Sequence, residues 1–74
     1  MSPALPQVSG RDVLRALEGA GFAHTSTKGS HAKLRHPDGR VIIVPLHKSV
    51  ARGTLSSILR QAGLTTAQLI ELLG

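Results

Sequence analysis

The 74-residue sequence contains no cysteine, no tryptophan, no tyrosine and a single phenylalanine. Without cysteine there is neither a disulfide framework nor a thiolate metal site, so packing or a partner must supply the stability, and we expect a cytoplasmic protein. Because Phe22 is the only aromatic residue, binding of single-stranded RNA by stacking bases on aromatic side chains is almost excluded.

Acidic residues are also scarce, four against nine Lys and Arg, which gives a formal net charge of +5. This excess favours a polyanionic partner, either a nucleic acid or an acidic protein. Long apolar runs are missing as well. The longest, such as Val41 to Val44, are far shorter than the ~20 residues that span a bilayer. The first ten residues have neither a basic start nor an apolar signal core, so we expect no membrane association.

The chain is short enough for one small domain. Residues 1–8 contain two prolines and no periodicity, and are expected to form a flexible arm before a single domain over residues 9–74. Ser9 and Asp12 have the spacing of a capping box, which predicts a helix starting near Gly10. Apolar stripes predict a second helix from Gly53 to Gly63 and a third after it, which starts with a second capping box at Thr65 and Gln68.

Three β-compatible segments lie between the first two helices, at residues 22–27, 30–36 and 40–44. Lys28-Gly29 is the expected two-residue turn between the first pair, and Pro37-Asp38-Gly39 is the expected turn between the second. The predicted order is α-β-β-β-α-α. The expected fold is therefore α+β, a three-stranded antiparallel sheet with helices on one face.

Side chains alternate along a strand, so Ala32 and Leu34 point to one face of the middle strand and His31, Lys33 and Arg35 to the other. The apolar pair should face the helices, which leaves the charged row on the open face. Such a row is often only a solvated surface. Its histidine makes it more interesting, because imidazole can both accept and donate a proton near neutral pH.

A histidine among cations has a defined role beside an RNA phosphodiester. It can take the proton from a 2′-hydroxyl or protonate the leaving 5′ oxygen, while Lys and Arg stabilise the charge on phosphorus, and no metal or other cofactor is needed. A metal site is not expected, because the separations of His24, His31, His36 and His47 match no familiar zinc spacing. We expect His24 on the surface and His36 packed at a hairpin end. His47 is either a second substrate contact or an exposed loop residue.

Several short pieces of the sequence, in this order, resemble the HicA-type toxins, small ribonucleases of bacterial and archaeal toxin–antitoxin pairs. The pieces are Gly21-Phe22, Lys28-Gly29-Ser30-His31, Pro37-Asp38-Gly39-Arg40, Val44-Pro45 with His47, Gly53-Thr54-Leu55, Ile58-Leu59 and Ala62-Gly63-Leu64. The resemblance implies a fold like that of double-stranded-RNA-binding domains, metal-independent cleavage of mRNA, and a HicB-type antitoxin that covers the active site. It also implies that His31 is the catalytic residue. The residues expected to contact RNA are Lys28, Gly29, Ser30, Lys33, Arg35, Arg40 and His47.

Two alternatives to a nuclease remain open from the sequence. The same fold and basic face could hold RNA without cutting it, or the charge could serve only an acidic partner protein. The third strand raises a separate question, because Val41 to Val44 is apolar on both faces at an expected sheet edge. Either the last helix or the N-terminal arm covers it, or an antitoxin or a second copy of the chain packs there.

Overall fold

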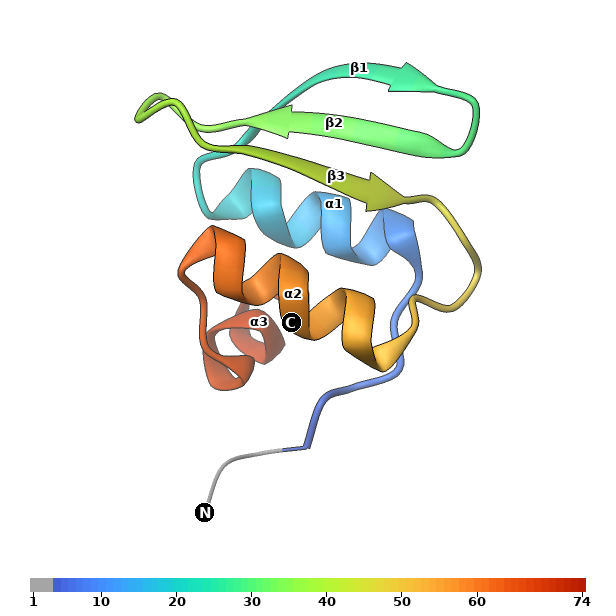
Figure 1. Ribbon diagram of the computed structural model, residues 1–74. Coiled ribbons are helices and arrows are strands. Elements are labelled where there is room, and N and C mark those ends of the chain that lie inside the picture. The colour runs from blue at the N-terminus through green and yellow to red at the C-terminus, as the bar shows by residue number, and fades with distance from the viewer. Residues whose placement is uncertain (1–3) are drawn as a thin grey trace.

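The computed structural model describes residues 4–74. It contains a three-stranded antiparallel sheet that is covered on one face by helices (Figure 1). The elements in chain order are α1 (Gly10–Gly19), β1 (Ala23–Lys28), β2 (His31–Arg35), β3 (Val41–Pro45), α2 (Arg52–Ala62) and α3 (Thr66–Leu73). The predicted α+β class and element order are confirmed. Residues 1–3 of the predicted arm lie outside the described residues. In the part that is described, no helix is long and apolar enough to cross a membrane.

Two of the helices start with the capping boxes that the sequence predicts. The Ser9 hydroxyl accepts the Asp12 backbone N–H at 3.1 Å, and Asp12 accepts the Ser9 N–H at 3.1 Å. The Ser9 backbone N–H, followed by the Ser9 side chain, lowers the pKa of the Asp12 carboxyl below its ordinary value. Thr65 and Gln68 repeat the arrangement at α3. These reciprocal bonds satisfy backbone donors that a helix start otherwise leaves unpaired.

The turn between β1 and β2 differs from the prediction by one residue. Lys28 pairs directly with His31, so the two turn residues are Gly29 and Ser30 rather than Lys28 and Gly29. The physical reason is the backbone of Gly29, whose φ of 60° suits the first central position of a type II′ hairpin turn. Lys28 is therefore the last residue of β1 and shares a face of the sheet with His31.

The core lies between the sheet and the helices. β2 and β3 bury alternate side chains toward it, with Ala32 and Leu34 both 0% exposed. Helix α1 contacts all three strands, α2 contacts β3, and α3 packs on α1. Every residue of β1 is exposed, so this strand is held mainly by its ladder with β2.

The outward side chains of β3 remain uncovered by the described residues. Val41 is 41% and Ile43 is 49% exposed, while Ile42 and Val44 are buried. The sequence left open whether the last helix or the N-terminal arm covers β3. In the structure, neither the last helix nor the described part of the arm covers these side chains. An apolar strip remains on the open face of the sheet.

The start of α1 lies against the end of β3. A Cβ added to Gly10 would lie 2.1 Å from the Pro45 carbonyl oxygen and 2.6 Å from the Leu46 Cα. The Gly10 N–H donates to the His47 carbonyl at 2.9 Å, and the Val50 N–H donates to the Val8 carbonyl at 2.9 Å. The predicted arm is thus anchored at its last residue, and its flexibility before that stays a prediction.

Replacing Gly10 by Ala should destabilise the fold, because the new methyl group meets backbone atoms that cannot move without shifting β3 or α1. We expect the free energy of unfolding to fall by about 3 kcal/mol, the upper end for overpacking, measured by urea denaturation followed by circular dichroism. Gly53→Ala is the matched control: its Cβ meets nothing within 4 Å, so it should stabilise α2 by roughly 0.5–1 kcal/mol. A Gly10→Ala variant as stable as the Gly53→Ala variant would contradict the close approach.

Candidate active site

The open face of the sheet carries the predicted charged row. His31, Lys33 and Arg35 of β2 are exposed and alternate with buried residues, as strand parity predicts. Lys28 of β1 stands directly opposite His31, and Ser26 stands opposite Lys33. Opposite residues of an antiparallel pair share a face with their Cβ atoms about 4.5–5.5 Å apart. The structure therefore places two ammonium groups next to the imidazole of His31.

These side chains line a shallow hollow on the sheet surface. Its volume is about 530 Å³, and it is lined by Ser26, Lys28, His31, Lys33 and Ile43. None of the lining residues is acidic, so the hollow suits an anion. Ile43 stands opposite Lys33 in the β2–β3 ladder and supplies one apolar wall. Ser26 and Ile43 are not among the site residues that the sequence predicts, because only the strand register shows which residues of β1 and β3 flank His31.

His47 lies beside this hollow, at the end of the sheet. The centroids of the His47 and His31 rings are 6.4 Å apart, with an interplanar angle of 69°. The backbone around His47 is tied on both sides. The Leu46 N–H donates to the Ser30 carbonyl at 2.6 Å, and the His47 carbonyl accepts from Gly10. His47 is an exposed loop residue and also lies near the candidate site, so its role as a second substrate contact stays a prediction.

Gly29 and Ser30 occupy the tip of the β1–β2 turn rather than the hollow. Both are exposed, and neither lines the hollow. The contribution of Ser30 is its carbonyl, which accepts from Leu46 and so connects the turn to the segment that carries His47. Arg35 lies on the same face as His31 and Lys33, two residues further along β2.

The structure does not bring Arg40 to the hollow. Its Nη1 donates to the Ala62 carbonyl at 2.7 Å and to the Gln61 carbonyl at 3.3 Å, at the C-terminal end of α2. Its Nε donates to Asp38 at 2.8 Å, and its guanidinium carbon lies 5.3 Å from the centroid of the Phe22 ring. A cation is favourable at a helix C-terminus, where carbonyls lack partners. The sequence predicts an RNA contact at Arg40, but the structure places its guanidinium away from the hollow, where it joins α2 to the β2–β3 turn.

That turn is itself ordered by Asp38. The Arg40 backbone N–H donates to its carboxylate at 3.0 Å and, with the Arg40 side chain, lowers the pKa of Asp38 below its ordinary value despite the opposing effect of desolvation. His36 packs at this end as predicted, with its ring edge-to-face on Phe22 at 5.0 Å. His24 is exposed on β1, as predicted, with Nε2 2.7 Å from the Thr27 hydroxyl. No three His, Asp or Glu side chains gather in a metal-binding arrangement within residues 4–74.

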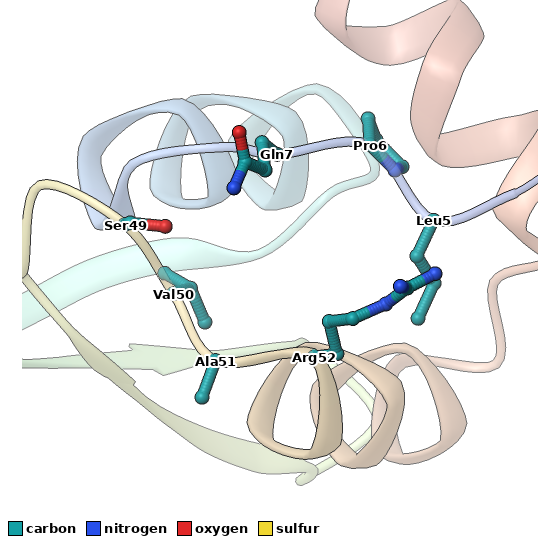
Figure 2. Close-up of a pocket in the computed structure, with 7 residues that line it drawn as sticks. All are labelled: Leu5, Pro6, Gln7, Ser49, Val50, Ala51 and Arg52. Atoms are coloured by element: carbon teal, nitrogen blue, oxygen red, sulfur yellow. The ribbon is translucent and has the colours of Figure 1, made fainter.

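A separate hollow of about 410 Å³ lies on another part of the molecule (Figure 2). It lies between residues 5–7 of the N-terminal segment and residues 49–51 of the β3–α2 connection, and the side chain of Arg52, the first residue of α2, extends toward Leu5. Its lining includes no histidine and no carboxylate. It offers no group for acid–base chemistry, whereas the hollow at His31 combines an imidazole with the side chains of two lysines.

A family model described as "HicA toxin of bacterial toxin-antitoxin" matches residues 10–64. The matched range covers α1, the whole sheet with its hollow, and α2, and it ends just after Gly63. No curated protein matches the chain.

Replacing Arg40 by Gln should lower the stability of the fold rather than the affinity for a ligand. Loss of its bonds to α2 and Asp38 is expected to lower the free energy of unfolding by about 1–2 kcal/mol, within the range for charged hydrogen bonds at a partly exposed site. Thermal denaturation measures this. Lys33→Gln is the control, since its exposed side chain has no such partners and should leave stability within about 0.5 kcal/mol. Equal midpoints for the two variants would contradict the structural role of Arg40.

Proposed function

Because this chain belongs to the HicA toxin family of bacterial toxin–antitoxin systems, we propose that it is an endoribonuclease that cleaves mRNA without a metal, with His31 as its catalytic residue. The observation that carries the proposal is the position of the His31 imidazole. It stands on the open face of the sheet in a hollow that also contains Lys28 and Lys33.

The chemistry needs a group that moves protons and groups that hold charge. The 2′ oxygen of a ribose loses its proton and bonds to the adjacent phosphorus, the bond from phosphorus to the 5′ oxygen breaks, and that oxygen gains a proton. His31 supplies one of these two proton transfers, as base or as acid. Lys28 and Lys33 stabilise the negative charge that grows on the phosphorane oxygens. The products are a 2′,3′-cyclic phosphate and a free 5′ hydroxyl.

RNA binding rests on charge and hydrogen bonds. Lys28, Lys33 and Arg35 share one face of the sheet, so a phosphate backbone that crosses this face meets several cations. Aromatic residues cannot contribute, because the only one, Phe22, is buried. Phosphate contacts carry no sequence information, so we expect low sequence selectivity.

Replacing His31 by Gln should abolish most cleavage while leaving RNA binding close to that of the wild type. A placed acid or base contributes about 10²- to 10⁴-fold, and this is the expected fall in the rate of cleavage measured on labelled RNA. His24→Gln is the matched control: this histidine is also exposed on the sheet but lies outside the hollow, so its loss should leave the rate unchanged.

Three further readings of the same assay test the mechanism. Wild-type cleavage should persist in EDTA, a deoxyribose substrate should resist, and end mapping should find 2′,3′-cyclic phosphates. Undiminished cleavage by the His31→Gln variant would show that the site assignment is wrong. A wild-type chain that binds RNA but never cuts it would instead support the alternative of a non-catalytic RNA-binding module.

Membership of a toxin–antitoxin family indicates an antitoxin partner, and the sheet suggests where it packs. In the β2–β3 ladder, Val41 stands opposite Arg35 and Ile43 stands opposite Lys33. The exposed apolar strip of β3 therefore continues the face that contains His31. A HicB-type antitoxin that buries Val41 and Ile43 would also close the hollow, and a second copy of this chain is the competing occupant.

Replacing Val41 by Ser should weaken antitoxin binding by about tenfold or more, equivalent to roughly 1.4 kcal/mol of lost apolar contact, while the rate of RNA cleavage stays unchanged. Titration calorimetry with the cognate antitoxin measures the affinity. Ile70→Ser is the control, because Ile70 of α3 has the same 41% exposure but lies on a helix away from the sheet face. If only self-association in sedimentation experiments responds to Val41→Ser, a second copy of the chain occupies the strip instead.

A further inference from the structure

We propose that His47 is a second catalytic residue, which forms an acid–base pair with His31. The inference rests on the proposed ribonuclease function and deepens it. It starts from one observation: the ring of a residue that follows β3 lies 6.4 Å from the ring of His31, on a surface whose other site residues come from β1, β2 and β3.

The reaction itself calls for two groups. The attacking 2′ oxygen and the leaving 5′ oxygen lie on opposite sides of phosphorus. The 2′ oxygen loses its proton while the 5′ oxygen gains one. One imidazole within hydrogen-bond reach of the first oxygen, about 2.6–3.2 Å, cannot serve the second at the same moment. A ribonuclease without a metal therefore gains from a second group that transfers protons near neutral pH.

The residues around the hollow leave few candidates for this second group. Lys28 and Lys33 line it, and Lys48 follows His47, but an ammonium group has no acceptor atom and can only donate hydrogen bonds. Helix α1, which packs against this end of the sheet, contributes Asp12, whose carboxylate already accepts the Ser9 N–H. His47 is the neighbour of His31 that can accept and donate a proton near neutrality.

The geometry of the two rings fits a shared substrate. At a centroid separation of 6.4 Å and an interplanar angle of 69°, the imidazoles neither stack nor bond to each other. Within residues 4–74 neither ring forms a hydrogen bond, and both rings belong to exposed residues. One phosphodiester group placed over this end of the sheet is within reach of both.

His47 is also held in place, as a catalytic group must be. Backbone hydrogen bonds fix its segment at Leu46, at His47 itself and at Val50, to partners in the β1–β2 turn, α1 and the residue before the Ser9 cap. Gly10 permits this arrangement, because any larger residue would collide with Pro45 and Leu46. These bonds use main-chain atoms only, so the imidazole can be replaced without breaking them.

In the proposed step, the neutral imidazole of the pair takes the 2′-hydroxyl proton as the bond between that oxygen and phosphorus forms. The bond from phosphorus to the 5′ oxygen breaks, and the protonated imidazole gives its proton to that oxygen. The two rings have then exchanged protonation states, and solvent restores them because both are exposed.

The test compares His47→Gln with His31→Gln and with Lys48→Gln, in the full chain, on an RNA oligonucleotide across a range of pH. We expect His47→Gln to lower kcat by about 10²- to 10⁴-fold with KM little changed. The wild type should give a bell-shaped profile, and the two histidine variants should each lose one limb, the opposite one in each case. Lys48→Gln, an adjacent cation in the same segment, should raise KM and keep both limbs.

A second substrate identifies the acid. In this substrate, sulfur replaces the leaving 5′ oxygen, and a sulfur leaving group needs no proton. Its cleavage should therefore return to the wild-type rate in the histidine variant that lacks the acid. Full kcat and both limbs in His47→Gln, or no rescue of either variant, would overturn the pair and make His47 an RNA contact only. If His47→Gln keeps full activity while His31→Gln is inactive, the proposed ribonuclease function still holds. A wild type that cuts no RNA would overturn both the histidine pair and the proposed function. Circular dichroism and urea midpoints confirm that each variant is folded.

Discussion

The burial of two apolar side chains, Ala32 and Leu34, fixes the face of the sheet on which the candidate site lies. β2 is the central strand and pairs on both sides, so its register determines those of β1 and β3. A slip of one residue would turn His31, Lys33 and Arg35 under the helices. Burying a leucine contributes about 1.5–3 kcal/mol, while burying an unpaired charge costs several kcal/mol. Both effects favour the observed register, and the row of cations follows from it.

Local signals in the sequence were sufficient for much of this fold. Both capping boxes, the left-handed Gly63 at the end of α2 and the alternation along β2 depend on residues a few positions apart, and each was predicted. The first turn was placed one residue early. Gly29 can serve either position of a two-residue turn, and the ladder with His31 decides between them. The conformational freedom of glycine makes it a clear turn signal but a poor marker of register.

The parts that escaped prediction depend on contacts distant in the sequence. Arg40 looked like another surface cation of the patch, but the carbonyls it binds are 21 and 22 residues away, at the end of a helix. His47 is a candidate contact from the sequence alone, but its place beside His31 depends on the approach of Gly10 to Pro45 and Leu46. Ser26 and Ile43 join the hollow only through strand pairing. The kind of chemistry could be inferred from the residue types in the sequence. Which residues line the site could be read only from the tertiary structure.

The hollow at His31 is shallow, and all the helices lie on the opposite side of the sheet (Figure 1). Among residues 4–74 there is no flap or lid above it, so this surface is open in the structure. If the chain is the ribonuclease proposed above, occupancy of this face would be enough to switch it. The fraction of molecules able to cut RNA would then be set by the concentration of the covering partner and its dissociation constant, and loss of that partner would release the activity without any rearrangement of the fold.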